Sequence, residues 1–239
     1  MRLDVYLVEN GYFESRNRAL EAIKSGKVKV DGKIAKPSVK CDEKSNVEVE
    51  NEKFYASRAG RKLEAFLEEH EIDLNGKKAL DIGSSTGGFA QILLENGVES
   101  LTCVDVGTNQ LHFTIRDDKR AEVHENCDIR NFRIDGGFGV ISCDVSFISL
   151  EDILNDINTL ALYNCDIILL YKPQFEVGRL VKRDSNGVVT DIDAIRHTRV
   201  GFEKKCEELG WKKIIDIPSR IQGKEGNIEY FYHFRKVEV

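Results

Sequence analysis

From Gly76 onward the sequence alternates short apolar segments with amphipathic ones, and this alternation limits the possible folds most. The apolar segments have the length and composition of strands, and they span residues 77–83, 100–106, 121–126, 138–145 and 165–171. The segments with helical spacing span residues 87–97, 149–162 and 192–210. Strands that alternate with helices predict an α/β fold in which helices cover both faces of a parallel sheet.

Two later segments, residues 212–218 and 227–236, also have strand composition, and the gap between them is too short for a crossover helix. Parallel neighbours need such a crossover, whereas antiparallel neighbours do not. We therefore expect residues 227–236 to run antiparallel and to close the edge of a mostly parallel sheet.

The first 50 residues have a different organisation. One helix can run from Leu3 to Gly11, and a second can run from its cap Ser15 to Gly26. Residues 28–34 then alternate about a central Asp-Gly pair, which is typical of a two-residue hairpin turn. The pattern predicts a small α+β unit ahead of the larger fold.

Charge is unevenly distributed between these parts. Residues 1–64 contain 14 basic and 11 acidic residues, a net charge of +3, whereas the remaining 175 contain 21 and 30, a net charge of −9. The N-terminal part is therefore the better candidate for contact with nucleic acid.

This N-terminal part, over about residues 1 to 48, resembles the small RNA-binding domain named after ribosomal protein S-four. The resemblance is carried by Arg2-Leu3-Asp4, Ser15-Arg16, Ile23, Gly26, Val28-Lys29-Val30, Gly32 and Lys36-Pro37. It implies that basic side chains contact RNA, and the candidates are Arg2, Arg16, Arg18, Lys24, Lys27, Lys29 and Lys36, with Arg58 and Arg61 beyond the domain. The alternative is a helical hairpin whose charges only face solvent.

The stretch DIGSSTGGF, residues 81–89, follows the first strand of the larger part and suggests a ligand approached closely by backbone. A dinucleotide fingerprint would need glycine where Ser85 stands, and a P-loop would need lysine where Phe89 stands. Asp81 could bind an ammonium group, and Asp105, at the end of the next strand, could bind ribose hydroxyls. An amino acid joined to a nucleoside without phosphate fits, which predicts S-adenosylmethionine as the cofactor.

The same stretch is similar to the first motif of S-adenosylmethionine-dependent methyltransferases, and the chain from about Tyr55 resembles their Rossmann-like FtsJ-like group. The whole chain resembles the TlyA family of ribosomal RNA methyltransferases, in SRAGRKL, DIGSSTGGF, DVG, CDVSFISL, YKPQFEVG, NGVV and GNIEYF. Thr108 and Asn109 depart from the family pattern, which has an aromatic residue and a glycine there. The expected organisation is an S-four-like domain at 1–50, a linker at 51–57 and a methyltransferase domain at 58–239.

The resemblance also implies a set of cofactor contacts. The candidates are Asp81, Gly83, Ser84, Ser85, Thr86, Gly87, Gly88, Phe89, Asp105, Val106, Asp128 and Ile129. For Asp128, a contact to adenine and a helix cap are both open.

Four residues match the family's catalytic arrangement, namely Lys62, Asp144, Lys172 and Glu229. A ribose 2′-hydroxyl is a poor nucleophile at neutral pH and needs a partner that accepts or steers its proton. We assign this role to Lys172, with the other three positioning it and the ribose. The alternatives are a solvated or phosphate-binding Lys62, a cross-strand ion-pair partner at Glu229, and structural roles for Asp144 and Lys172.

The implied activity is 2′-O-methylation of cytidine ribose in ribosomal RNA or a ribosomal subunit. The chain has the shorter family layout, which points to the large-subunit site. An inactive RNA-binding ribosome factor and a membrane-damaging cytolysin are the alternatives. No apolar run approaches the length that spans a bilayer, and no signal peptide is visible, so we expect a cytoplasmic protein. The six cysteines are scattered, and His112 and His197 have no second ligand-like residue nearby, which argues against a metal site.

Overall fold

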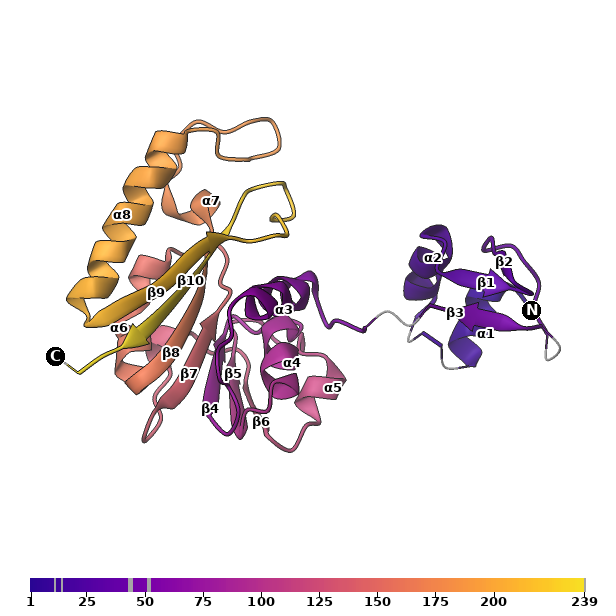
Figure 1. Cartoon of the computed structure of the whole chain (residues 1–239), viewed down its shortest axis with the longest axis horizontal. Helices are drawn as coiled ribbons and strands as arrows, with labels where there is room; N and C mark the ends of the chain where they lie inside the picture. The colour runs from indigo at the N-terminus through magenta and orange to yellow at the C-terminus, as the bar shows by residue number, and fades with distance from the viewer. Residues whose placement is uncertain (11, 14, 43–44, 51–52, 239) are drawn as a thin grey trace. The chain divides into compact units, whose positions relative to one another are not determined.

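The computed structural model describes residues 1–239 except 11, 14, 43–44, 51–52 and 239. It divides into two compact units, residues 1–54 and residues 55–239, shown in Figure 1. The expected linker at 51–57 includes two residues outside the described part, and its extent stays a prediction. Gly11, the expected end of the first helix, also lies outside the described residues.

The N-terminal unit has the predicted two helices and hairpin. Ser15 caps the second helix by accepting a hydrogen bond from the backbone N–H of Arg18, and Asp31 and Gly32 have the positive φ angles of a tight hairpin turn. The last strand, which the sequence analysis missed, completes a sheet of order β2-β1-β3. The elements are α1 (Leu3–Glu9), α2 (Arg16–Lys24), β1 (Val28–Val30), β2 (Lys33–Ile34) and β3 (Val47–Val49).

The larger unit is built on a seven-stranded sheet of order β6-β5-β4-β7-β8-β10-β9. Strands β4 to β8 are parallel to their neighbours among these five. β10 runs antiparallel to both β8 and β9, as expected for this edge. β9 forms the outermost strand beyond it. The strands are β4 (Lys78–Ile82), β5 (Ser100–Val104), β6 (Ala121–His124), β7 (Phe138–Cys143), β8 (Ala161–Tyr171), β9 (Trp211–Pro218) and β10 (Tyr230–Lys236).

Helices cover both faces of this sheet (Figure 1). Side chains alternate along β8, so that Leu169 packs with α6 and α8 on one face and Leu170 packs with α3 and α4 on the other. The helices are α3 (Arg58–Glu69), α4 (Gly88–Glu95), α5 (Phe113–Arg116), α6 (Leu154–Leu160), α7 (Pro173–Glu176) and α8 (Ile192–Glu208), with 3-10 turns η1 (Ile129–Asn131) and η2 (Leu150–Asp152).

One expected boundary is wrong. The helix predicted over residues 149–162 consists of η2 and α6 and ends at Leu160. β8 begins at Ala161, which pairs with Phe138 of β7 and is buried. Pairing with the neighbouring strand therefore overrides the helical pattern of the sequence at these residues.

All six cysteines are free thiols, and five of them are buried. Within the described residues, no helix is long and apolar enough to cross a membrane, and no three His, Cys, Asp or Glu side chains group so as to hold a metal ion.

A buried carboxylate ties β8 to β10 and to the residue that precedes β4. Asp166 of β8 is 1% exposed and accepts hydrogen bonds from Lys77, His233 and Arg235. Burial alone would raise the pKa of Asp166, but the hydrogen bonds from these three side chains outweigh burial and lower it. The charged carboxylate therefore stabilises the fold above its unfolded pKa.

We expect Asp166→Asn to lower the free energy of unfolding at pH 7 by about 2 kcal/mol, because it removes the buried charged acceptor of the partly exposed Lys77 and Arg235. Since the folded pKa is depressed, the wild type loses this stabilisation as pH falls below about 4. Urea unfolding from pH 7 to pH 3 should show the two proteins converging toward low pH. A constant difference across this range would contradict the assignment.

Candidate active site

The candidate catalytic residues gather at the carboxyl end of the parallel strands. β7 ends at Cys143 and β8 at Tyr171, so Asp144 and Lys172 follow directly on two neighbouring strands. The chain adds β5 and β6 on one side of β4 and then returns to place β7 on the other side. Ligand sites in open α/β sheets lie at such a reversal of strand order.

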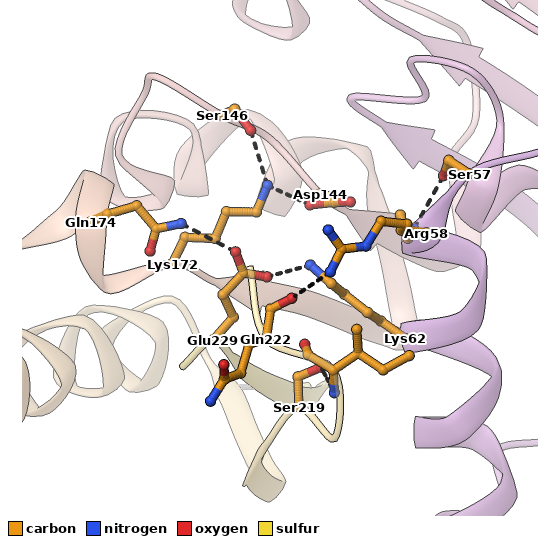
Figure 2. Close-up of polar contacts among 12 residues, drawn as sticks. Ser57, Arg58, Lys62, Asp144, Ser146, Lys172, Gln174, Ser219, Gln222 and Glu229 are labelled. Carbon is orange, nitrogen blue, oxygen red and sulfur yellow. Dashed lines mark hydrogen bonds and ion pairs between the residues drawn. The ribbon is translucent and has the colours of Figure 1, made fainter. Parts of the chain in front are cut away.

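Lys172 and Asp144 form the first of two buried ion pairs. Lys172 Nζ lies 2.6 Å from Asp144 Oδ1, and the two side chains are 9% and 14% exposed. Lys172 Nζ also donates a hydrogen bond to Ser146 Oγ at 3.0 Å. The ammonium group is thus held between a carboxylate and a hydroxyl, both from the segment that follows β7 (Figure 2).

Lys62 and Glu229 form the second pair. Lys62 comes from α3, and its Nζ donates to Glu229 Oε2 at 2.6 Å, with the side chains 10% and 3% exposed. The other oxygen of Glu229 accepts a hydrogen bond from Gln174 Nε2 at 3.1 Å. A lone buried carboxylate or ammonium would be costly, so each group stabilises the other.

The structure therefore brings together all four predicted catalytic residues, from positions 62, 144, 172 and 229. Figure 2 shows Glu229 between Lys62 and Gln174, with the Lys172 pair next to it. The alternative of a solvated Lys62 is wrong, because this side chain is buried and paired.

A cavity of about 460 Å³ opens beside the Lys172–Asp144 pair. Its lining combines Asp144 with six of the predicted cofactor residues, which are Gly83, Ser85, Asp105, Val106, Asp128 and Ile129. Gly83 has φ +77°, and a Cβ there would lie 2.8 Å from the backbone oxygen of Asp144. Glycine is therefore required for β4 and the segment after β7 to approach each other at the cavity.

Asp105 shapes the loops at the cavity edge. Its Oδ2 accepts a hydrogen bond from the backbone N–H of Ser85 at 2.8 Å, and its Oδ1 accepts one from Gly107 at 2.6 Å. Each carboxylate oxygen retains a further lone pair for a ligand hydroxyl.

Asp128 caps η1 by accepting from the backbone N–H of Arg130, so one of its two open roles is observed. The Arg130 guanidinium hydrogen-bonds the same carboxylate and lowers the pKa of Asp128. Contact with adenine stays a prediction.

Asp81, near the end of β4, is fully buried and is not among the residues that line the cavity, although Ile82 and Gly83 after it are. Burial raises its pKa to about 7, against the hydrogen bond that Ser142 Oγ donates to Oδ1 at 2.7 Å. Its Oδ2 has no hydrogen-bond partner among the described residues. Ser84 is also buried and donates to the Asp81 backbone oxygen. The free oxygen is an acceptor that a cationic ligand group could use.

Other predicted cofactor residues serve packing and do not line the cavity. Gly88 lies against α3, where a Cβ would come within 2.7 Å of the Gly60 nitrogen. Gly87 has φ +96° at the start of α4, and Phe89 is buried and stacks on Phe231. The Thr86 backbone oxygen accepts from His112. Cofactor contact by these residues stays untested.

The predicted RNA-binding residues are exposed or half-buried. In the N-terminal unit, fully buried Asp4 accepts hydrogen bonds from Arg2 and Arg16, so both guanidinium groups are held in place. Arg18 lies over the Phe54 ring. On the same unit, Lys24 and Lys36 are exposed, and Lys27 and Lys29 are half-buried. In the larger unit, Arg58 donates to the Gln222 backbone oxygen and Arg61 lies over the Tyr55 ring.

Two polar partners of the ion pairs, Ser146 and Gln174, were missed by the sequence analysis. Each lies two residues after a predicted catalytic residue, in CDVSF and YKPQF. Proximity in these motifs was the available signal, but neither type of side chain titrates, so neither suggested proton chemistry.

Residues 55–236 match the family model of the FtsJ-like methyltransferases, and residues 1–47 match the S4 domain. A Campylobacter jejuni relative named 23S rRNA (cytidine-2′-O)-methyltransferase TlyA is 45% identical over 99% of this chain and 100% of its own. A Mycobacterium tuberculosis relative named 16S/23S rRNA (cytidine-2′-O)-methyltransferase TlyA is 36% identical over 98% of this chain and 89% of its own. A solved structure from Streptococcus thermophilus, described as a hemolysin, is 33% identical and covers 100% of this chain and 89% of that one, with a TM-score of 0.74.

These matches confirm the resemblance and the fold class drawn from the sequence, an α/β methyltransferase fold preceded by an S4 domain. Both curated relatives are matched over nearly the full length of this chain. The chain therefore belongs to the TlyA family, whose methyltransferase domain is FtsJ-like.

Proposed function

We propose that this protein transfers a methyl group from S-adenosylmethionine to the 2′-oxygen of a cytidine in ribosomal RNA. The observation that carries the proposal is the two lysine–carboxylate pairs, one of which contributes Asp144 to the lining of the cavity. The names of the two curated relatives supply the nucleotide, and both include the 23S RNA. The large-subunit RNA, within a ribosomal particle in the cytoplasm, is accordingly the proposed substrate.

The residues around the cavity suit the proposed cofactor. The unpartnered oxygen of Asp81 would accept from the ammonium of its amino-acid part, and the Asp105 carboxylate would accept from ribose hydroxyls. Ile129 and Val106 supply apolar lining for the adenine. When bound, S-adenosylmethionine supplies an electrophilic methyl group on a positively charged sulfur.

The chain's own residues would then handle the ribose. Lys172, held by Asp144 and Ser146, would hydrogen-bond the 2′-oxygen and steer its proton away as the new bond forms. Lys62 and Glu229 would fix the substrate side of the site. Because all four charges are paired before substrate arrives, little reorganisation is needed during transfer.

The relatives' names favour this activity over the cytolysin alternative, although one solved relative is described as a hemolysin. An inactive RNA-binding factor would have no use for two buried, ordered ion pairs at the sheet's ligand-binding end. Mapping of ribose methylation in ribosomal RNA, with and without this protein, tests the proposal directly. Absence of any cytidine 2′-O-methyl group that depends on the protein would reject it.

We expect Asp105→Ala to weaken the binding of S-adenosylmethionine or its demethylated product by about 10- to 100-fold, because it removes a charged acceptor. It also releases the backbone N–H groups of Ser85 and Gly107 at the cavity edge. Isothermal titration calorimetry measures the change. Asp117→Ala, an exposed carboxylate after α5, is the charge-matched control. Unchanged cofactor affinity in Asp105→Ala, or tight binding of NAD or ATP by the wild type, would contradict the assignment.

A further inference from the structure

The first turn of α7 contributes one side chain to each of the two ion pairs. Lys172 caps α7 and contacts Asp144, and Gln174 donates from Nε2 to Glu229 Oε1. Glu229 holds Lys62 through its other oxygen, as Figure 2 shows. A single short turn therefore links the two pairs.

The backbone of this turn is fixed from both sides. Pro173 occupies the first helical position, where its restricted φ favours helix initiation. The Arg183 guanidinium donates hydrogen bonds to the backbone oxygens of Gln174 and Gly178, each at 3.0 Å. The Gln174 side chain thus starts from a well-defined position.

The Gln174 amide has one partner that sets its orientation. Its nitrogen faces the Glu229 carboxylate, and its oxygen is buried with no hydrogen-bond partner in the described part of the chain. The opposite orientation would place the amide oxygen against a carboxylate oxygen, and neither can donate. The contact between Gln174 and Glu229 therefore depends on the amide N–H as the donor.

Glu229 has little freedom to turn away from this donor. It is 2% exposed, and the backbone of Gly223 lies so close that a Cβ there would be 2.6 Å from Glu229 Oε1. The Gln174 amide N–H donates to Oε1, which leaves Oε2 facing Lys62, so this contact fixes the orientation of the carboxylate that pairs with Lys62.

We propose that Gln174 is a positioning residue, which keeps the Glu229 carboxylate aimed at Lys62 and couples this pair to Lys172. The inference rests on the methyl transfer proposed above. Gln174 acts through Glu229 and need not touch the cofactor.

Two substitutions separate this role from simple packing. Gln174→Leu removes the donor and should lower the single-turnover methylation rate about 10- to 100-fold, the effect of losing a hydrogen bond to a charged group. Gln174→Glu keeps the shape of the side chain, but the new carboxyl group can donate a hydrogen bond to Glu229 only when it is protonated. Two adjacent carboxylates share a proton at low pH and repel each other when both ionise. The methylation rate of Gln174→Glu, relative to the wild type, should therefore be high below about pH 6. As pH rises, it should fall toward the rate of Gln174→Leu.

Gln222→Glu is the matched control, since it makes the same charge change on an exposed side chain close to the site. Its pH profile should keep the wild-type shape. Parallel profiles for Gln174→Glu and the wild type, with methylation intact, would overturn the positioning role and leave the proposed function standing.

A second readout does not need turnover. The ¹³Cε resonance of Lys62, in protein labelled at lysine, reports the state of its carboxylate partner. It should shift with pH in Gln174→Glu over the range where the rate falls, and not in Gln222→Glu. An unshifted Lys62 resonance would also overturn the inference, even if the wild type transferred no methyl group at all.

Discussion

Lys172→Ala should lower the single-turnover rate of methyl transfer by about 10³-fold, the scale of losing a positioned proton-transfer group. Affinity for S-adenosylmethionine should remain near wild type, because Lys172 does not line the cavity. A residue that acts mainly in the transition state affects the chemical step and not cofactor binding. Rapid-quench assays with ribosomal substrate measure the rate, and calorimetry measures the affinity.

Lys172→Arg distinguishes two roles for the lysine. Arginine preserves the positive charge beside Asp144 but does not give up a proton at neutral pH. If Lys172 accepts the proton, the arginine variant should be as impaired as Lys172→Ala; if it steers the proton through charge alone, the arginine variant should keep part of the rate.

Lys78→Ala, an exposed lysine at the opposite end of β4, controls for the loss of one positive charge. Retention of most of the wild-type rate by Lys172→Ala would remove the catalytic assignment.

The sequence predicted the larger fold well because parallel strands, buried on both faces, produce continuous apolar segments. Asp144 and Lys172 were assigned from the family resemblance, and each also follows an apolar strand, where an isolated charge is costly. Lys62 and Glu229 were assigned only from the family resemblance. Their contact depends on how α3 and the segment before β10 pack, 167 positions apart, and no local pattern encodes it.

The loop around Asn109 depends on a backbone conformation and on side-chain contacts that the sequence does not reveal. The departure at Asn109 keeps the backbone geometry of the turn, because Asn109 adopts φ +55°, which asparagine tolerates better than most residues. Glu125 accepts the backbone N–H groups of Asn109, Gln110 and Leu111 and so holds this loop at the cavity edge. The sequence showed Glu125 only as a charge near the end of the strand expected over residues 121–126.

Removal of residues 1–54 should leave a folded, cofactor-binding protein that is nearly inactive on ribosomal RNA. The two hydrophobic clusters described for the larger unit are formed by side chains between Tyr55 and Phe234. Residues 55–239 carry 24 basic and 31 acidic residues, a net charge of −7, and would be repelled by RNA on average. Loss of several phosphate contacts should weaken RNA binding at least about 100-fold at moderate salt.

Salt dependence identifies the contacts that are lost. Binding of the full chain should weaken steeply with salt, and Lys24→Ala with Lys36→Ala should flatten that slope by about 2, one for each phosphate contact. Arg16 is a poorer probe, because its removal also takes away a partner of buried Asp4.

Cofactor affinity should be the same in the full and shortened chains, which separates lost recognition from lost folding. A shortened chain that methylates ribosomal substrate fully would instead place recognition in the larger unit, where Arg58 and Arg61 begin the helix that carries Lys62.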